Sequence, residues 1–282
     1  MVLKVLGPLD TGSAPLSPRE RAMLAALVVR LGSTVPPGDL AEAWWGEAPP
    51  RTWEQQVRNS VARIRSRLGR DTIETVGWEY RLAMDPDTID SVRFERLVSA
   101  ARGHELRAEH DRAIDVYTRA LAMWRGAALQ DVANWEPGVV EALRLHEIRT
   151  SAEEELLDAR LATGEHRSLI ADAERLLREE PLRENRWAIV ALANYRADRQ
   201  AEALAVLRAA RERLADELGI EPGPRLAALE LSCCARTPTS PRRHPPSLSP
   251  RSAPTPVYGP SARTMPMCFS AARPTRSRCS SG

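Results

Sequence analysis

The sequence predicts a mainly α-helical chain. It begins with a winged helix-turn-helix of the α+β class, continues into an all-α helical repeat domain and ends in a disordered tail. Three observations support this. A basic amphipathic helix and a hairpin occupy residues 53–82, apolar residues recur at helical spacing from 91 to 231, and the composition changes abruptly after Leu231. The predicted domain limits are 1–90, 91–232 and 233–282.

The first segment predicts a short strand followed by a helix. Residues 1–9 alternate weakly and end in Gly-Pro, which favours a strand and a turn. Ser17 is a suitable N-cap, Pro18 fits the first helical position, and Glu20 completes a capping box. Gly32 is expected to end the helix. Its buried face is predicted to comprise Met23, Leu24, Leu27, Val28 and Leu31.

Two further helices are predicted before the hairpin. Asp39 is expected to cap a short helix over 40–45, and adjacent prolines place a loop over 46–51. Thr52 is expected to cap the third helix, whose buried stripe is Val57, Val61, Ile64 and Leu68. The nearby tryptophans are expected to pack in the core or against the loop, in preference to a direct role in DNA binding. They are Trp44, Trp45 and Trp53.

A hairpin is predicted directly after the third helix. The run 72–76 is typical of a strand, Gly77-Trp78-Glu79 of a turn, and 80–82 of a second short strand. A basic helix followed by a hairpin is typical of a winged helix-turn-helix, in which the helix lies in the major groove of DNA and the wing reaches a phosphate or the minor groove.

The third helix carries no acidic residue between Gln55 and Arg70. A solvated basic face is the simpler interpretation, but the preceding helix and the following hairpin favour binding to double-stranded DNA. We expect Gln55, Asn59, Ala62 and Ser66 to face the groove floor, with Arg63 and Arg67 on one flank and Arg58 and Arg65 on the other. Arg63 and Arg65 are the first candidates. The full predicted set is Gln55, Arg58, Asn59, Ser60, Arg63, Arg65, Ser66, Arg67, Thr75 and Arg81.

The segment 91–231 is helical in pattern almost throughout. Three sets of small and large residues share the spacing i, i+4, i+7, and the last two sets are 34 residues apart. That period is typical of tetratricopeptide units, which pair helices and offer a groove to another protein. A plain helical spacer is the alternative. The sets are Ala113, Tyr117 and Ala120; Leu169, Ala173 and Leu176; and Ala203, Leu207 and Ala210.

The tail differs from the rest of the chain. Residues 231–282 carry eight arginines and no acid, whereas the chain before them carries 32 basic and 38 acidic residues. The tail is rich in Pro, Ser and Thr, which predicts disorder, and it is interpreted as a linker, a nonspecific nucleic-acid tail or a sequence read out of frame. All four cysteines lie after residue 232, so we expect no disulfide framework and a cytoplasmic protein.

No enzyme signature is found in the sequence. It has no phosphate-binding glycine loop, no metalloprotease motif and no nucleophile elbow, and its five histidines are scattered. Glu153, Glu154 and Glu155 are expected to form a solvated helix face. We therefore expect no catalytic residue, metal or cofactor. No apolar run approaches the length of a membrane span, so no membrane partner is expected.

Several segments occur in an order that resembles a known family. They include VLGPL at the N-terminus, LAEAWWGEAPPRT and VRNSVARIRSRLG around the third helix, and EEPLRE and ELGIEPGPRL near the end of the helical region. From about Met1 to Glu230 the chain resembles the Streptomyces antibiotic regulatory proteins. The resemblance implies a response-regulator-type winged helix and a bacterial transcriptional activator domain. It also implies binding to promoter direct repeats, a homo-oligomer on DNA, recruitment of RNA polymerase holoenzyme, control of secondary-metabolite genes and a nucleoid location.

One departure from the family pattern affects the wing. The family usually has Gly-Tyr before the last strand, whereas Glu79 precedes Tyr80 here. An acid near phosphate costs affinity, and loss of Gly restricts the turn. A second hypothesis is therefore a helical-repeat interaction protein, or a truncated signalling regulator, with weak or no DNA binding. Arg63 and Arg65 buried in ion pairs with the helical domain would favour it.

Overall fold

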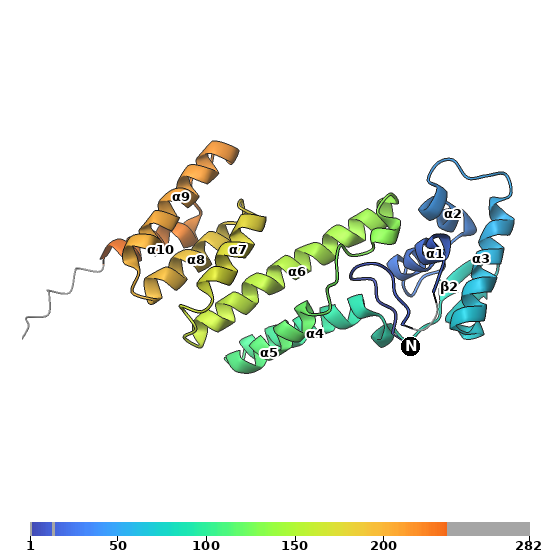
Figure 1. The fold of residues 1–282 in the computed structure, drawn as a ribbon, viewed down its shortest axis with the longest axis horizontal. Coiled ribbons are helices and arrows are strands. Elements are labelled where there is room, and N and C mark those ends of the chain that lie inside the picture. Colours follow the sequence, from blue (N-terminus) through green and yellow to red (C-terminus); the bar gives the residue numbers. More distant parts are fainter. Residues whose placement is uncertain (1, 13–14, 236–282) are drawn as a thin grey trace, which may run out of the picture. The chain divides into compact units, whose positions relative to one another are not determined.

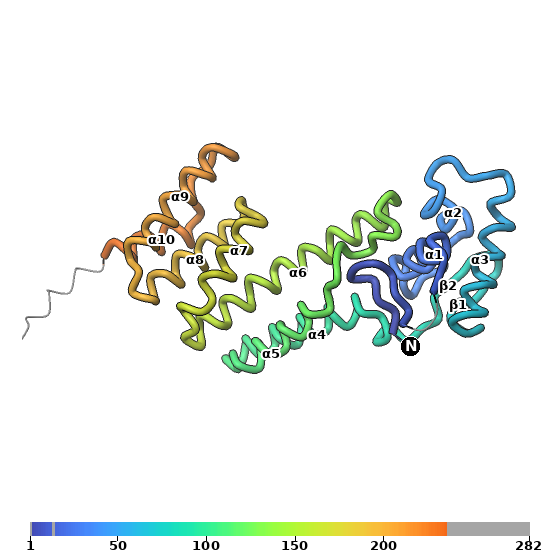
Figure 2. Tube along the Cα trace, viewed as in Figure 1, coloured from blue at the N-terminus to red at the C-terminus, as the bar shows by residue number. Residues whose placement is uncertain are grey.

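The computed structural model describes residues 2–12 and 15–235, and these belong to one compact unit (Figures 1 and 2). The expectation of a disordered tail falls mostly on residues 236–282, which lie outside the described residues. The winged helix-turn-helix is built from three helices and a hairpin: α1 (Pro18–Val29), α2 (Pro37–Trp45), α3 (Trp53–Leu68), β1 (Ile73–Val76) and β2 (Glu79–Leu82).

Local capping explains where α1 begins, and it confirms the predicted start. The Ser17 side chain accepts a hydrogen bond from the Glu20 N–H at 3.4 Å, and the Ser17 N–H donates to Glu20 Oε2 at 2.7 Å. These are the two reciprocal bonds of a capping box. The cap predicted for α2 was wrong, because α2 begins at Pro37 and Asp39 lies inside its first turn. Thr52 precedes α3 without a side-chain cap.

The predicted hairpin is confirmed, and a two-residue turn closes it. Val76 pairs with Glu79, so only Gly77 and Trp78 connect the strands. Gly77 has a φ of +63°, which suits the first turn position of a two-residue hairpin and is costly for other residues. The strand predicted over 1–9 was wrong in extent: among the described residues of that segment only isolated bridges form, from Leu3 and Lys4.

Seven α-helices follow within the described residues, and they bury the predicted repeat positions. Every member of the three small-and-large sets is at most 4% exposed. Figure 1 shows α4 and α5 alongside the long α6, with α8, α9 and α10 packed together farther along the chain. The helices are α4 (Asp90–Glu105), α5 (His110–Leu121), α6 (Glu136–Ala162), α7 (Ile170–Glu179), α8 (Glu184–Arg196), α9 (Gln200–Leu218) and α10 (Pro224–Ala235).

Buried carboxylates join the N-terminal segment to the helical part. Asp90 accepts backbone hydrogen bonds from Val5 and Leu6 at 2.7 and 3.2 Å. Asp131 accepts from Arg21 Nε at 2.7 Å. Burial raises the pKa of Asp90 above its ordinary value, although the Val5 and Leu6 N–H groups oppose this. One apolar core accordingly extends from the winged helix into the first helices that follow it.

The acidic run on α6 corrects a prediction. Glu154 is buried and accepts hydrogen bonds from Arg183 Nε and Asn185 Nδ2, both at 2.8 Å. Glu153 pairs with Arg186, and Glu155 accepts from the Tyr117 hydroxyl at 2.9 Å. The three acids therefore form contacts between helices instead of a solvated face. Glu153 and Glu154 face the buried Arg186 of α8, and Glu155 faces Tyr117 of α5 and Arg102 of α4.

The predicted start of the tail was also early. The chain stays helical to Ala235, and Cys233 is fully buried in the core formed by α8, α9 and α10. Gln200 Nε2 donates to the Cys233 carbonyl at 2.6 Å. Cys233 and the exposed Cys234 are therefore part of the folded protein, and burial raises the pKa of the Cys233 thiol.

Candidate nucleic-acid interface

Helix α3 separates an apolar stripe from a polar outward face. Val57, Val61 and Ile64 are buried against α1 and α2, and Leu68 is half-buried at the helix end. The spacing of these residues turns the opposite side of the helix to solvent. Gln55, Asn59, Ala62 and Ser66, the residues predicted for the groove floor, are exposed on this outward face, and Arg58, predicted on a flank, is exposed beside them.

The polar side chains of the outward face bind one another. Gln55 Nε2 donates to Asn59 Oδ1 at 2.9 Å, and Arg58 Nη2 donates to Gln55 Oε1 at 3.2 Å. Arg58 also lies 3.6 Å from the Glu54 carboxylate. These contacts are exposed, so base edges and phosphates can replace them at small cost. The amides of Asn and Gln can pair with adenine edges, and the guanidinium group of Arg can pair with guanine edges.

Arg63 and Arg67 form one flank of the outward face, and both bind Glu20 of α1. Arg63 Nε lies 3.0 Å from Glu20 Oε1, and Arg67 Nη1 lies 2.6 Å from Glu20 Oε2. Burial opposes ionisation of Glu20. The hydrogen bonds from Ser17 and the two guanidinium groups outweigh it and hold the pKa of Glu20 below its ordinary value.

Arg65, on the other flank, connects α3 to the wing. Its Nε donates to the Ile73 carbonyl at 2.8 Å, and its Nη2 donates to Thr75 Oγ1 at 2.8 Å. Arg65 is half-buried, so its first role is to fix the hairpin against the helix. Within the wing, Arg81 pairs with Glu74 across the strands at 2.6 Å. Of the two predicted wing residues, Thr75 is exposed and lies beside α3, whereas the strand register places Arg81 on the other face of the hairpin.

Ser60 is a correction to the predicted set. Its side chain is fully buried, and its hydroxyl donates to the Gln56 carbonyl at 2.9 Å. Ser60 lies three residues after Val57 and four before Ile64, which places it on the buried stripe. In this conformation it offers nothing to a DNA strand.

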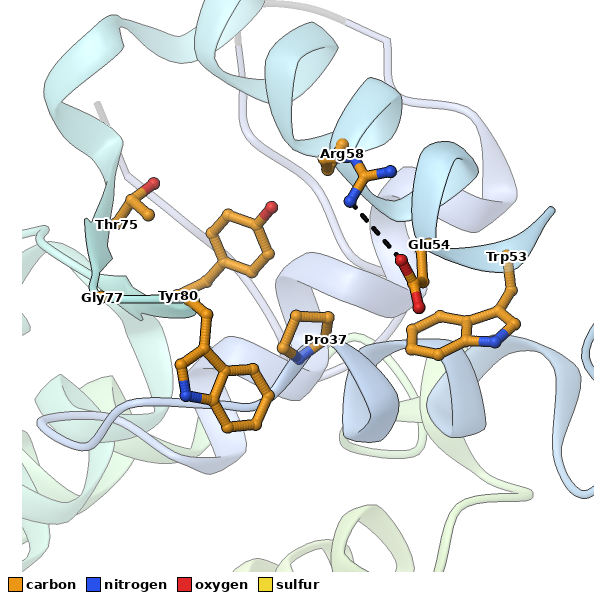
Figure 3. A pocket seen from close by; sticks show the side chains of 8 residues that line it. Pro37, Trp53, Glu54, Arg58, Thr75, Gly77 and Tyr80 are labelled. Atoms are coloured by element: carbon orange, nitrogen blue, oxygen red, sulfur yellow. Dashed lines mark ion pairs between the residues drawn. The ribbon is translucent and has the colours of Figure 1, made fainter.

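A cavity of about 400 Å³ lies between α3 and the wing (Figure 3). Trp53, Glu54 and Arg58 line it from α3, Pro37 lines it from α2, and the hairpin contributes Thr75, Gly77, Trp78 and Tyr80. Trp78 is 69% exposed at the tip of the hairpin. The sequence pattern predicted Trp78 only as part of the turn. An exposed aromatic residue in a two-residue turn was the signal that could have identified it as a surface contact.

The ion pairs of the candidate interface stay within the winged helix. Arg63 binds Glu20, and Arg65 binds the wing, so neither is engaged by the helical part. Burial of Arg63 and Arg65 in ion pairs with the helical domain would have favoured a module without DNA binding, and the described residues do not show it. Glu20 was predicted only as a capping residue; its second role follows from packing between α1 and α3, which no sequence pattern records.

No metal or membrane feature accompanies the interface. Within residues 2–12 and 15–235, no group of three or more His, Cys, Asp or Glu side chains could hold a metal ion. None of the helices described here combines the length and the apolar character needed to cross a bilayer.

Comparison with known proteins identifies the family. The model of the bacterial transcriptional activator domain matches residues 89–232. The regulatory protein DnrI of Streptomyces peucetius is 32% identical over 246 residues, which cover 82% of this chain and 90% of DnrI. The chain belongs to the Streptomyces antibiotic regulatory protein family.

Other members of the antibiotic regulatory protein family differ in length. The regulatory protein AfsR of Streptomyces griseus is 37% identical over 236 residues, or 80% of this chain. This chain spans only 24% of the length of AfsR. The solved structure of Mycobacterium tuberculosis EmbR, in complex with a low-affinity phosphopeptide, is 31% identical with a TM-score of 0.78, and the match covers 85% of this chain and 66% of EmbR. The mainly helical fold with an N-terminal winged helix is shared with that structure.

Proposed function

We propose that this protein is a sequence-specific DNA-binding transcriptional activator. The observation that supports this most is the outward face of α3, where Gln55, Arg58, Asn59 and Ser66 are exposed in a row beside a hairpin. A helix with this face fits the major groove, and the wing then lies over the adjacent backbone. Membership of the family supports the same function.

Each part of the interface has a distinct proposed task. Asn59 and Gln55 pair with adenine edges, and Arg58 pairs with a guanine edge or a phosphate. Arg63 and Arg67 contact phosphates along one strand, which fixes the register of the helix without reading sequence. The wing contributes Thr75, Arg81 and the exposed Trp78, so the acid at Glu79, half-buried in β2, does not occupy the tip.

The remaining proposals concern the whole protein. The helical domain recruits RNA polymerase holoenzyme to promoters of secondary-metabolite genes. Two or more copies bind direct repeats as a homo-oligomer on DNA, in the cytoplasm at the nucleoid. A protein with this task needs no catalytic group, and we propose that it is not an enzyme. The domain division at residue 90 is part of this proposal; α4 begins there, and the family match begins at residue 89.

Footprinting on DNA upstream of neighbouring genes tests the proposed function. We expect protected direct repeats whose centres are separated by about one helical turn or a multiple of it, since copies in the same orientation must present α3 to the same side of the duplex. Transcription of the same fragment with purified holoenzyme should rise only when the repeats are intact. Absence of any protected repeat, at an ionic strength that permits binding, would contradict the proposal.

A further inference from the structure

Glu20 combines burial with exposed partners. Its side chain is 1% exposed, whereas Arg63 and Arg67 are 53% and 39% exposed at the edge of the α3 outward face. Each carboxylate oxygen binds a different guanidinium group. A buried carboxylate therefore lies directly beneath two side chains that face solvent.

Several further bonds make this arrangement rigid. The Ser17 N–H donates to Glu20 Oε2 at 2.7 Å, which fixes the carboxylate at the start of α1. Arg67 Nη1 also donates to the Pro15 carbonyl at 2.9 Å, and Arg63 Nη2 donates to Ser60 Oγ at 3.3 Å. Each guanidinium group is thus held at two points, and its rotamer freedom is largely lost before any DNA arrives.

Two physical consequences follow for a strand that approaches this edge. Pre-oriented arginines give up little additional conformational entropy on binding, which favours the one backbone position that matches them. The carboxylate also cancels one of the two positive charges, so attraction to phosphate in any position is weaker. Both effects raise binding to the matching site relative to binding elsewhere.

We propose that Glu20 is a positioning residue that sets the sequence discrimination of the DNA-binding surface. It does so by holding Arg63 and Arg67 in one orientation toward the phosphates of one strand and by limiting their nonspecific attraction. The partner chemistry is the phosphodiester backbone of double-stranded DNA. This inference rests on the proposed DNA-binding function.

The capping role of Glu20 can be separated from this one. A glutamine at the third helical position also accepts the hydrogen bond from the N-cap N–H. Its amide has a single acceptor oxygen and no charge, so it cannot bind Ser17 and both arginines as the carboxylate does. Glu20→Gln should therefore keep α1 intact while it releases the arginines.

Binding is measured by fluorescence anisotropy on the footprinted repeat and on random DNA over a series of salt concentrations. The discrimination ratio is the Kd on random DNA divided by the Kd on the repeat. For Glu20→Gln we expect tighter binding to random DNA and a salt slope steeper by about one. We expect the discrimination ratio to fall roughly tenfold, because loosened phosphate contacts no longer fix the register of α3.

Two variants separate charge from geometry. Glu42→Gln removes an exposed acid of α2 outside the outward face of α3, so it should tighten binding to both DNAs by equal factors and leave the ratio unchanged. The double variant Glu20→Gln with Arg63→Gln restores the net charge. Its salt slope should return to the wild-type value while its ratio stays low.

The outcomes that overturn the inference are distinct from failure of the proposed function. If Glu20→Gln and Glu42→Gln give the same ratio, Glu20 acts only through its charge. If the Glu20→Gln variant binds both DNAs more weakly by equal factors and melts at a markedly lower temperature, the role of Glu20 is structural only. If the wild-type protein shows no salt-sensitive DNA binding, the proposed function fails and this inference fails with it.

Discussion

Replacement of Arg186 by methionine should destabilise the helical domain strongly. The Arg186 side chain is 2% exposed on α8, and it lies 3.4 Å from carboxylate oxygens of both Glu153 and Glu154 and donates to the Leu176 carbonyl. Removal of one partner of a buried ion pair costs about 3–5 kcal/mol, because the remaining charge stays buried. Arg183 still binds Glu154, so we expect the lower end, about 3 kcal/mol.

Thermal unfolding followed by circular dichroism measures this effect. For a unit of this size about 3 kcal/mol corresponds to a fall in Tm of about 6–12 °C. Arg175→Met is the matched control, since Arg175 and Glu179 form an exposed i, i+4 pair worth less than about 1 kcal/mol. If both variants melted within about 2 °C of the wild-type protein, the buried network would not stabilise the domain as argued here.

Three further predictions concern the end of α10, the pH dependence and the wing. A chain truncated after Ala235 should melt at the same temperature as the full chain. Truncation after Leu231 should lower the Tm by about 4–8 °C, because the buried Cys233 side chain and the hydrogen bond from Gln200 to its carbonyl are lost. Equal Tm values for the two truncated chains would contradict a stabilising role of Cys233 in the core. The lowered pKa of Glu20 means that its ionised form contributes stability above the ordinary value of 4.5, and that this contribution is lost as the pH falls through the lowered pKa. Urea unfolding should therefore show the stability of the wild-type protein approaching that of Glu20→Gln as the pH falls below 4.5, and a constant difference would refute this. Trp78→Ala should leave the Tm unchanged and weaken DNA binding about fivefold, from roughly 1 kcal/mol of lost apolar contact, and unchanged anisotropy titrations would exclude the wing tip from the interface.

Local patterns predicted the elements of the winged helix well. The capping box at Ser17 and Glu20 depends on residues three apart, and the stripe of α3 depends on one helical period, so both can be recognised in a single sequence. The buried position of Ser60 could have been recognised from the same period, since it lies between Val57 and Ile64 on the stripe. The prediction gave its hydroxyl more weight than its spacing.

The features that were missed depend on partners distant in sequence. Glu154 is buried because Arg183, which is 29 residues away, binds it, and charge alone gives no sign of this. Cys233 is buried because Gln200 and the apolar side of α9 lie against α10, although the composition there already resembles the tail. Asp39 lies within α2 because Pro37 can occupy the first helical turn. Tertiary packing decided each of these cases.

The central claim is that the outward face of α3 reads DNA sequence, and Asn59→Ala tests it most directly. Asn59 is exposed, and its side-chain oxygen accepts a hydrogen bond from the exposed Gln55, so the substitution leaves the core intact. Kd values on the protected repeat and on random DNA at one stated salt concentration are compared with those of the wild-type protein. We expect the discrimination ratio to fall by about 5- to 140-fold, from roughly 1–3 kcal/mol per base contact, with random-DNA affinity unchanged. An unchanged ratio would contradict the claim that this face of α3 recognises the bases.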